Sequence, residues 1–364
     1  MLRSLLLYLS EAGWVKRFVT RFPLARRVAR RFVAGETPDE AIAAVRELNA
    51  HGIAASVDYL GENVYTTAEA ERAVEDYLHI LNKIDQAGVT ANVSLKLTHL
   101  GLDLGESVCV NNLRRILEHA RRQGNFVRID MEGSDYTERT LAVFRTLRHE
   151  HGFDNVGIVI QSYLYRSEGD IAALVEEGAR VRLCKGAYQE PPDLAFPRKS
   201  DVDANYVKLA RRLLEGAAHS AENEDSKRAA GRDAPATPGA ARTMESKNAK
   251  LMAGRDVPAI RGADTPEGEH GNRKIPPLPG LATHDHKMIE AARACALELN
   301  LPHNRFEFQM LYGIRRELQT KLIADGFQLR VYVPYGSQWY PYFMRRLAER
   351  PANLWFFLTA LFRG

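Results

Sequence analysis

Cysteine is scarce in this sequence of 364 residues, which has three: Cys109, Cys184 and Cys295. They are widely spaced and odd in number, so they fit neither a disulfide framework nor a Cys-x-x-Cys metal site. We therefore expect a protein of the reducing cytoplasm that needs no disulfide.

Long hydrophobic runs are also lacking. No apolar stretch approaches the roughly 20 residues of a membrane-spanning helix. The run from Leu5 to Leu9 is too short, and too soon followed by Glu11, for a signal peptide. We expect a chain that is neither exported nor inserted through a bilayer.

A strong charge of one sign is absent as well. The chain has 50 basic and 46 acidic residues, and its formal net charge is +4. This excess is too small to indicate nucleic-acid binding. It is compatible with an anionic ligand or an anionic membrane surface.

The sequence does contain a regular alternation of elements. From about residue 50 onward, short apolar and β-branched runs alternate with longer segments of helical period, the pattern of repeated strand-helix units. Eight strands are predicted: Ile53 to Asp58, Ala91 to Leu97, Phe126 to Met131, Val156 to Gln161, Arg180 to Lys185, Gly280 to Thr283, Phe306 to Met310 and Leu329 to Val333. No Gly-x-Gly-x-x-Gly turn follows the first strand, so a TIM-like (β/α)8 barrel is favoured over a doubly wound sheet.

Three further segments complete the predicted organisation. Residues 1–50 form an N-terminal helical segment, and residues 51–364 form the barrel. Between about 217 and 274 aromatic residues vanish and charges roughly cancel, which predicts a disordered insertion. Residues 353–362 are strongly apolar and fit either a helix that caps the core or a contact with the membrane surface, so peripheral attachment to the cytoplasmic membrane stays open.

Polar residues recur on one face of the predicted strands, late in each strand. In a barrel this face points inward, and active sites lie where the strands end. The inward set is Lys96, Asp130, Gln161, Arg182 and Tyr332. Because an unpaired buried polar group costs about 1 to 3 kcal/mol, these residues imply an internal ion-pair network or a polar ligand.

The charges near this edge are cationic in sum. Lys185, Arg345 and Arg346 add to the inward cations, against Asp130 and Glu349. This balance favours a ligand that bears a carboxylate or phosphate. A metal is not expected, because His284 to His286 are adjacent at a strand end and point in different directions.

Several segments resemble, in order, the motifs of the proline dehydrogenase family. They are Val93 to Leu97, Arg128 to Glu132, Gln161 to Tyr163, Arg182 to Tyr188, Ala282 to Asp285, Phe308 to Gly313, and Tyr332 to Gly336 with Arg345 to Glu349. The similarity runs from about Arg31 to the C-terminus and is typical of the short, monofunctional bacterial form. It implies a barrel that binds FAD, oxidises L-proline to 1-pyrroline-5-carboxylate and passes electrons to a membrane quinone.

The resemblance also implies roles for individual residues. Asp130 and Arg182 are implied as active-site residues. The implied substrate contacts are Lys96, Arg345 and Arg346 on the proline carboxylate, Tyr332 and Leu311 on its ring, and Tyr188 and Glu349 beside them. The implied flavin contacts are Asp130, Met131, Gln161, Arg182, Lys185, Gly186, Ala187, Thr283 and His284. Cys184 and Gln189 depart from the expected residue types, which affects the fine tuning of the flavin.

Two other functions remain open at this point. An inward lysine, Lys96 or Lys185, is also the nucleophile expected of a Schiff-base aldolase on the same barrel. Alternatively, the basic charge and the apolar C-terminus suit a membrane or scaffold module with an inactive barrel. A flavin spectrum that is bleached by proline would distinguish a proline dehydrogenase from both of these alternatives.

Overall fold

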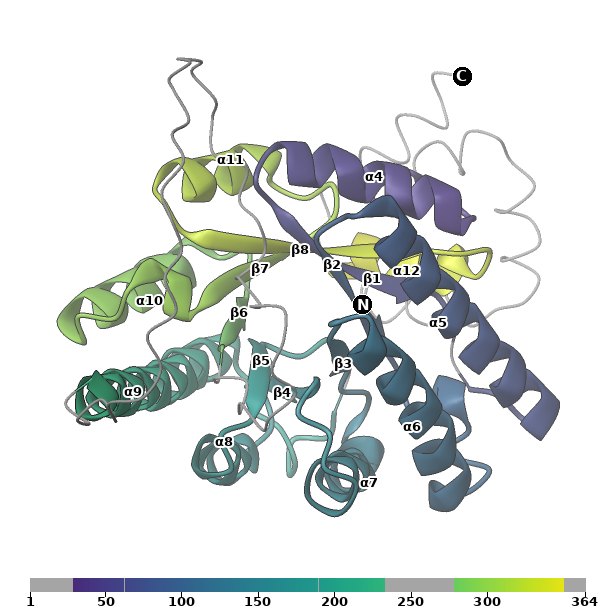
Figure 1. Cartoon of the computed structure of the whole chain (residues 1–364), viewed down its shortest axis with the longest axis horizontal. Coiled ribbons are helices and arrows are strands. Elements are labelled where there is room, and N and C mark those ends of the chain that lie inside the picture. Colours follow the sequence, from purple (N-terminus) through teal and green to yellow (C-terminus); the bar gives the residue numbers. More distant parts are fainter. Residues whose placement is uncertain (1–28, 62, 189, 233–277, 350–364) are drawn as a thin grey trace, which may run out of the picture.

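The computed structural model describes residues 29–61, 63–188, 190–232 and 278–349, and eight parallel strands in these ranges close into a barrel ringed by helices (Figure 1). The strands follow one another around the barrel in chain order. Their bounds are β1 Ala54–Tyr59, β2 Ala91–Leu95, β3 Val127–Ile129, β4 Val156–Gln161, β5 Arg180–Cys184, β6 Gly280–Ala282, β7 Glu307–Leu311 and β8 Gln328–Tyr335. The predicted (β/α)8 class is therefore confirmed, and each predicted strand is found within a few residues of its expected place.

The barrel closes between its first and last strands. β1 pairs with β8 over six residues in parallel register, from Ala54 opposite Arg330 to Tyr59 opposite Tyr335. All strands run in the same direction, so their C-terminal ends meet at one rim, where active sites of this fold lie.

Helices cover the outside of the barrel. The long ones are α4 Pro38–Ala50, α5 Thr67–Ala87, α6 Glu106–Arg122, α7 Ser134–Arg145, α8 Ser167–Glu176, α9 Lys199–Arg232, α10 His286–Glu298, α11 Arg316–Ala324 and α12 Trp339–Glu349. Short turns of 3-10 helix lie at Thr98–Leu100 and His303–Arg305, and a π-helical turn, Thr146–Glu150, extends α7.

The N-terminal segment contains the helix that the sequence predicts. Thr37 caps α4 in a capping box with Glu40, and Pro38 takes the first helical position. Backbone hydrogen bonds from Ala34 to Pro334 and from Gly336 to Gly35 attach this segment to the end of β8. Residues 1–28 lie outside the described part of the chain.

The predicted insertion begins too early. α9 continues to Arg232, so residues 217–232 are helical instead of disordered. Ala217 itself is buried in the core, which explains why the helix does not end there. Residues 233–274 of that prediction lie outside the described residues, as does the apolar segment 353–362.

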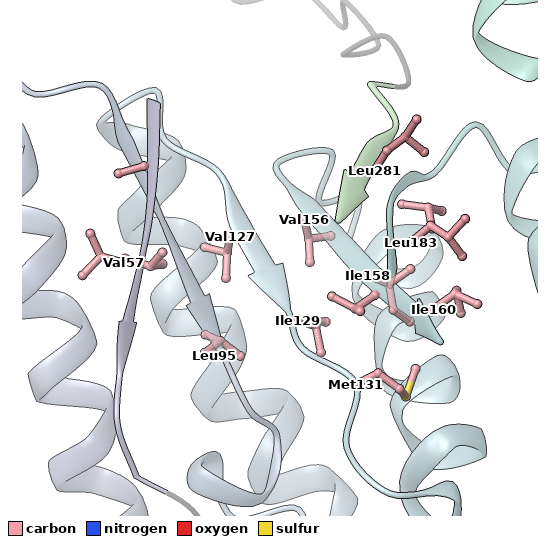
Figure 2. Close-up of a cluster of buried hydrophobic side chains, with 14 of the residues drawn as sticks. Val57, Leu95, Val127, Ile129, Met131, Val156, Ile158, Ile160, Leu183 and Leu281 are labelled. Atoms are coloured by element: carbon pink, nitrogen blue, oxygen red, sulfur yellow. The ribbon is translucent and has the colours of Figure 1, made fainter. Parts of the chain in front are cut away.

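The main core lies between the barrel and its helices. Figure 2 shows buried apolar side chains from neighbouring strands, among them Val57, Leu95, Ile129, Ile158 and Leu183. These residues alternate along the strands with the polar ones, as expected when one face packs on helices and the other lines the lumen. The polar face is therefore inside the barrel.

A second, aromatic-rich core joins the two ends of the described chain. It contains Phe32 and Val33 from the N-terminal segment and Trp339 and Phe343 from α12. Tyr332 and other half-buried residues of the rim pack against it. This core holds α12 beside the C-terminal end of β8 (Figure 1). Among the residues that the structure describes, none of the helices has the length and apolar character needed to cross a bilayer.

Candidate active site

The inward side chains of the strands form two polar layers. The lower layer, nearer the N-terminal ends of the strands, contains Asn92, Arg128, Glu307 and Arg330. The upper layer, nearer the rim, contains Ser94, Asp130, Arg182, Gln309 and Tyr332. Both layers come from the alternating pattern that the sequence analysis used, and hydrogen bonds across the lumen confirm that these side chains point inward.

Arg182 occupies the centre of the upper layer. Its side chain is 7% exposed. The guanidinium donates to Gln309, to Ser94 at 3.1 Å, to Asp130 at 2.8 Å and to Ser56 at 3.2 Å. These acceptors come from four different strands or strand ends, so the position of Arg182 is fixed by the barrel itself.

Asp130 is the acceptor at the end of β3. It accepts from Ser94 at 2.8 Å and, through its other oxygen, from the Tyr332 hydroxyl at 2.7 Å, in addition to Arg182. Burial raises the pKa of Tyr332 well above its ordinary value, and the Asp130 charge raises it further. Tyr332 therefore remains a neutral donor, and the Arg182 guanidinium lies 5.3 Å from its ring centroid.

Lys96 lies at the same rim, next to a buried carboxylate. Its Nζ is 3.6 Å from Oδ2 of Asp58, near the end of β1, and the Asp58 side chain is 1% exposed. The separation defines an ion pair but is longer than a normal hydrogen bond. Lys96 and Asp58 thus face each other in a site largely closed to water.

Gln161 provides a buried acceptor at the end of β4. Its Nε2 is 3.5 Å from the Met131 carbonyl, whereas its Oε1 has no hydrogen-bond partner within the described ranges. Gln161 is 3% exposed. Since native proteins seldom leave such an atom unsatisfied, this oxygen is suited to the N–H group of a ligand.

Lys185 is paired with two aspartates at the rim. Its ammonium contacts Asp203 at 2.5 Å and Asp285 at 2.9 Å, and Lys199 also binds Asp203. The predicted cationic sum of the site omitted Asp58, Asp203 and Asp285, so the cationic excess is smaller than the sequence suggested. A Schiff-base lysine must present its amine to a carbonyl substrate, whereas the Lys185 side chain is engaged by two carboxylates, so this pairing disfavours an aldolase at Lys185.

The loop after β5 approaches its neighbours closely. Gly186 has φ of 111°, and a Cβ there would collide with the ring of Tyr163, so a side chain is excluded. Glu190 accepts from the Tyr163 hydroxyl at 3.0 Å and from the backbone N–H of Ser134 at 2.9 Å. Ala187 and Tyr188, which follow Gly186 in this loop, are half-buried.

The ends of β6 and β7 are joined by a histidine. The Leu311 backbone N–H donates to Nε2 of His284 at 2.9 Å, and Arg315 donates to the His284 carbonyl at 2.7 Å. The neutral imidazole consequently carries its proton on Nδ1. The preceding residue, Thr283, accepts from the Asp285 backbone N–H at 3.0 Å, which links this strand end to the Lys185 group.

α12 brings the paired arginines to the rim. Arg345 and Arg346 are half-buried, and the aromatic-rich core places their helix against Leu311 and Tyr332. Burial raises the pKa of Cys184 to about 12, and the charges of Arg182 and Arg346 oppose that rise. Arg346 is therefore near the end of β5. Glu349 is the last residue of α12, and its side chain, like the whole of Gln189, lies outside the described part.

The structure thus brings most predicted site residues to one rim, and it adds some that the sequence analysis missed. Asp58 ends a predicted strand with the same parity as Ser56, so its inward position was available from the pattern. Asp203 and Asp285 carried no such signal, since they are 18 and 100 positions from Lys185. In the described ranges no group of three or more His, Cys, Asp or Glu side chains is arranged to hold a metal.

The fold and this rim define a (β/α)8-barrel protein with a buried, charge-bearing site at the C-terminal ends of its strands. Comparison with known proteins narrows the class. The sequence profile described as proline dehydrogenase matches residues 41–231 and 267–357, and the chain belongs to the proline dehydrogenase family.

Individual relatives agree with this assignment. Proline dehydrogenase 1 of Bacillus subtilis subsp. natto is 34% identical over 363 residues, which cover 100% of both chains. Proline dehydrogenase of Deinococcus radiodurans is 36% identical over 93% of this chain and 91% of its own. A crystal structure of proline utilization A (PutA) from Bdellovibrio bacteriovorus, inactivated by N-propargylglycine, superimposes with a TM-score of 0.69 at 25% identity, over 89% of this chain and 33% of that longer one.

Proposed function

We propose that this protein uses bound FAD to oxidise L-proline to 1-pyrroline-5-carboxylate, the first step of proline catabolism, and that the electrons pass to a membrane quinone. The observation that carries the proposal is the buried Asp130–Arg182 pair, which Tyr332 also binds, in a chain of this family. Lys96 follows β2, and α12, which carries Arg345 and Arg346, packs beside Tyr332. Cations beside a fixed polar group suit a small amino acid whose carboxylate must be held in one orientation.

The residues present fit a flavin. The Oε1 atom of Gln161 is a buried acceptor suited to an N–H of the pyrimidine edge. Gly186 gives the loop after β5 its turn, because its φ of 111° and the adjacent Tyr163 ring exclude a side chain there. Met131, Lys185, Ala187, Thr283 and His284 would complete the flavin contacts. When bound, the flavin supplies the acceptor for the hydride that leaves the carbon beside the proline nitrogen.

Arg182 supplies a fixed positive charge beside that cofactor. Asp130 and Gln309 hold its guanidinium in place, so no reorganisation is needed during the reaction. A buried cation favours negative charge on a neighbouring group, which makes reduction of an adjacent ring easier.

Three cations, Lys96, Arg345 and Arg346, would form a clamp that orients the substrate. Lys96 would act from the end of β2, and Arg345 and Arg346 would act from α12, which follows β8, so two elements would supply the cations for the proline carboxylate. Leu311 and Tyr332 would pack on the ring, with Tyr188 and Glu349 beside them. This arrangement fixes which carbon is presented for oxidation.

The electron acceptor and the location follow from the same proposal. A quinone dissolved in the bilayer requires the enzyme to reach the membrane surface, so we place the protein in the cytoplasm, peripheral on the inner face of the membrane. The apolar segment 353–362 is the part of the sequence suited to that contact.

The proposal is tested with purified protein and an artificial electron-accepting dye. We expect reduction of the dye that depends on L-proline, little reduction with D-proline, and loss of activity after incubation with N-propargylglycine, the compound that inactivates the related Bdellovibrio enzyme. A protein that reduces no dye with L-proline, or whose lysine is trapped by borohydride on a carbonyl substrate, contradicts it.

A further inference from the structure

Lys96 has a buried counter-ion that the proposed reaction does not use. The Asp58 carboxylate, fully enclosed at the end of β1, lies 3.6 Å from the Lys96 ammonium. Asp58 lies opposite Ser94 in the parallel register of β1 and β2. Ser94 precedes Lys96 by two residues, so Asp58 lies deeper in the barrel than Lys96. The ion pair therefore joins Lys96 at the rim to Asp58 in the interior of the barrel.

The other groups around Asp58 are neutral or already paired. Its charge acts on Tyr77 on α5 and on Tyr332 and Tyr335 on β8, and the charge of Asp130 acts on Tyr77 and Tyr332 as well. Asp130 is bound to Arg182. Burial raises the pKa of each of these three phenols, and the Asp58 charge raises them further, so the phenols stay protonated through neutral pH.

We propose that Asp58 is a positioning residue of the substrate clamp: its buried carboxylate keeps the Lys96 ammonium charged and in place to receive the substrate carboxylate. This inference rests on the proposed function. A buried ammonium without a counter-ion loses its proton more readily, because burial disfavours the charged form. Asp58 offsets that penalty at Lys96, and α12 adds the positive charge that attracts the substrate.

The test replaces Asp58 by the similarly shaped but neutral asparagine. For Asp58→Asn we expect the KM for proline to rise about tenfold while kcat stays within about threefold, with unchanged flavin content. The alkaline decline of kcat/KM should begin at lower pH, because Lys96 then loses its proton sooner. Asp58→Glu retains the charge and should keep the decline where it is in the wild type.

A matched control makes the same substitution in an exposed ion pair. Asp39 binds Lys83 at 2.8 Å, and its side chain is 77% exposed. Asp39→Asn should leave KM, kcat and the pH profile unchanged. A change in this variant equal to that of Asp58→Asn would overturn the assignment of the effect to the clamp.

A double-mutant cycle tests whether Asp58 acts through Lys96. In a Lys96→Met background, adding Asp58→Asn should change the KM by less than about twofold. Persistence of the full tenfold effect in that background would overturn the inference, as would a wild-type KM and pH profile in Asp58→Asn.

A binding measurement separates this inference from the proposed function. Calorimetry with cyclopentanecarboxylate, which has the ring and carboxylate of proline but no nitrogen to oxidise, reports on the clamp without turnover. Asp58→Asn should weaken its binding about tenfold, and equal affinity would contradict the inference. Failure of the wild type to oxidise proline, with this binding difference intact, would count against the proposed reaction alone.

Discussion

The lower layer of the barrel and the rim contain similar residue types, yet they differ in how the groups satisfy one another. In the lower layer Arg330 binds both oxygens of Glu307, at 2.9 and 3.1 Å, and also Asn92 at 3.0 Å. Above it, Gln161 retains a buried acceptor without a partner among the described residues, and Lys96 ends in an ion pair at the rim. Nε of Arg128 in the lower layer also lacks a hydrogen-bond partner among the described residues, but it lies below the site, whereas the Gln161 acceptor lies near the rim, where a ligand can bind.

Gln309 connects the two layers. It donates to Glu307 below and accepts from Arg182 above. Because Glu307 binds Gln309, the lower layer fixes the orientation of Gln309, and Gln309 in turn orients the Arg182 guanidinium. This explains why a barrel that binds a polar ligand carries charged groups well below the ligand site, where branched apolar residues are usual.

The largest effect is expected from breaking the lower layer. Burial raises the pKa of Glu307, but the charge and hydrogen bonds of Arg330 outweigh burial and keep this pKa below its ordinary value. Glu307→Gln leaves Arg330 without its buried counter-ion, and should reduce the free energy of unfolding by about 3 to 5 kcal/mol. Urea denaturation measures this loss. A variant as stable as the wild type would show that the lower layer is no scaffold.

A smaller effect, on binding only, is expected at the rim. Arg346→Met should raise the KM for proline about 10- to 100-fold, because a charge-assisted contact of about 1.5 to 3 kcal/mol is lost, while the affinity for FAD and the urea midpoint change little. Arg345→Met should behave in the same way. Steady-state kinetics and flavin titration check both, and unchanged proline kinetics would remove these residues from the clamp.

A substitution of Tyr332 tests whether this residue serves mainly the stability of the fold or the function of the site. Tyr332→Phe removes the hydroxyl that donates to Asp130 at 2.7 Å. A lost hydrogen bond to a buried carboxylate predicts a fall in kcat/KM of about fivefold to tenfold with a stability loss of about 1 kcal/mol. A stability loss as large as that of Glu307→Gln would place Tyr332 in the scaffold.

The smallest effect concerns the Lys185 group at the rim. Burial raises the pKa of Asp203, but its hydrogen bonds and ion pairs with Lys185 and Lys199 lower it more, to below the ordinary 3.8. A carboxyl with a depressed pKa stabilises the fold above its unfolded value, and that contribution disappears as pH falls through the folded value. Asp203→Asn should therefore lower the melting temperature at pH 7 by a small amount, and the difference should shrink as pH falls below 3.8 and vanish once Asp203 is protonated in the folded state. A constant difference across that range would contradict the ion-pair account.

The sequence was sufficient for the barrel and for the inward face. The strands containing Lys96, Asp130 and Arg182 show the alternation directly, and their order is the order around the barrel. α8 leaves a weaker local signal, because it is short and the residue at its start, Arg166, provides no side-chain cap.

The pairings within the site were harder to predict. Strand alternation shows that Asp58 and Asp130 point inward, but it does not show which cation each one binds. Those partners depend on depth in the barrel, so Asp130 meets Arg182 two strands away whereas Asp58 meets Lys96. Contacts such as Lys185 with Asp285 join residues far apart in the chain and leave no local pattern.

The central claim is that the rim around the buried Asp130–Arg182 pair holds a flavin beside the carboxylate of proline. The most direct measurement is the visible absorbance spectrum of the purified protein, in the absence of oxygen, before and after adding L-proline. We predict flavin bands that bleach on addition of L-proline. A protein without these bands after incubation with FAD, or bands that L-proline leaves unchanged, would contradict the account.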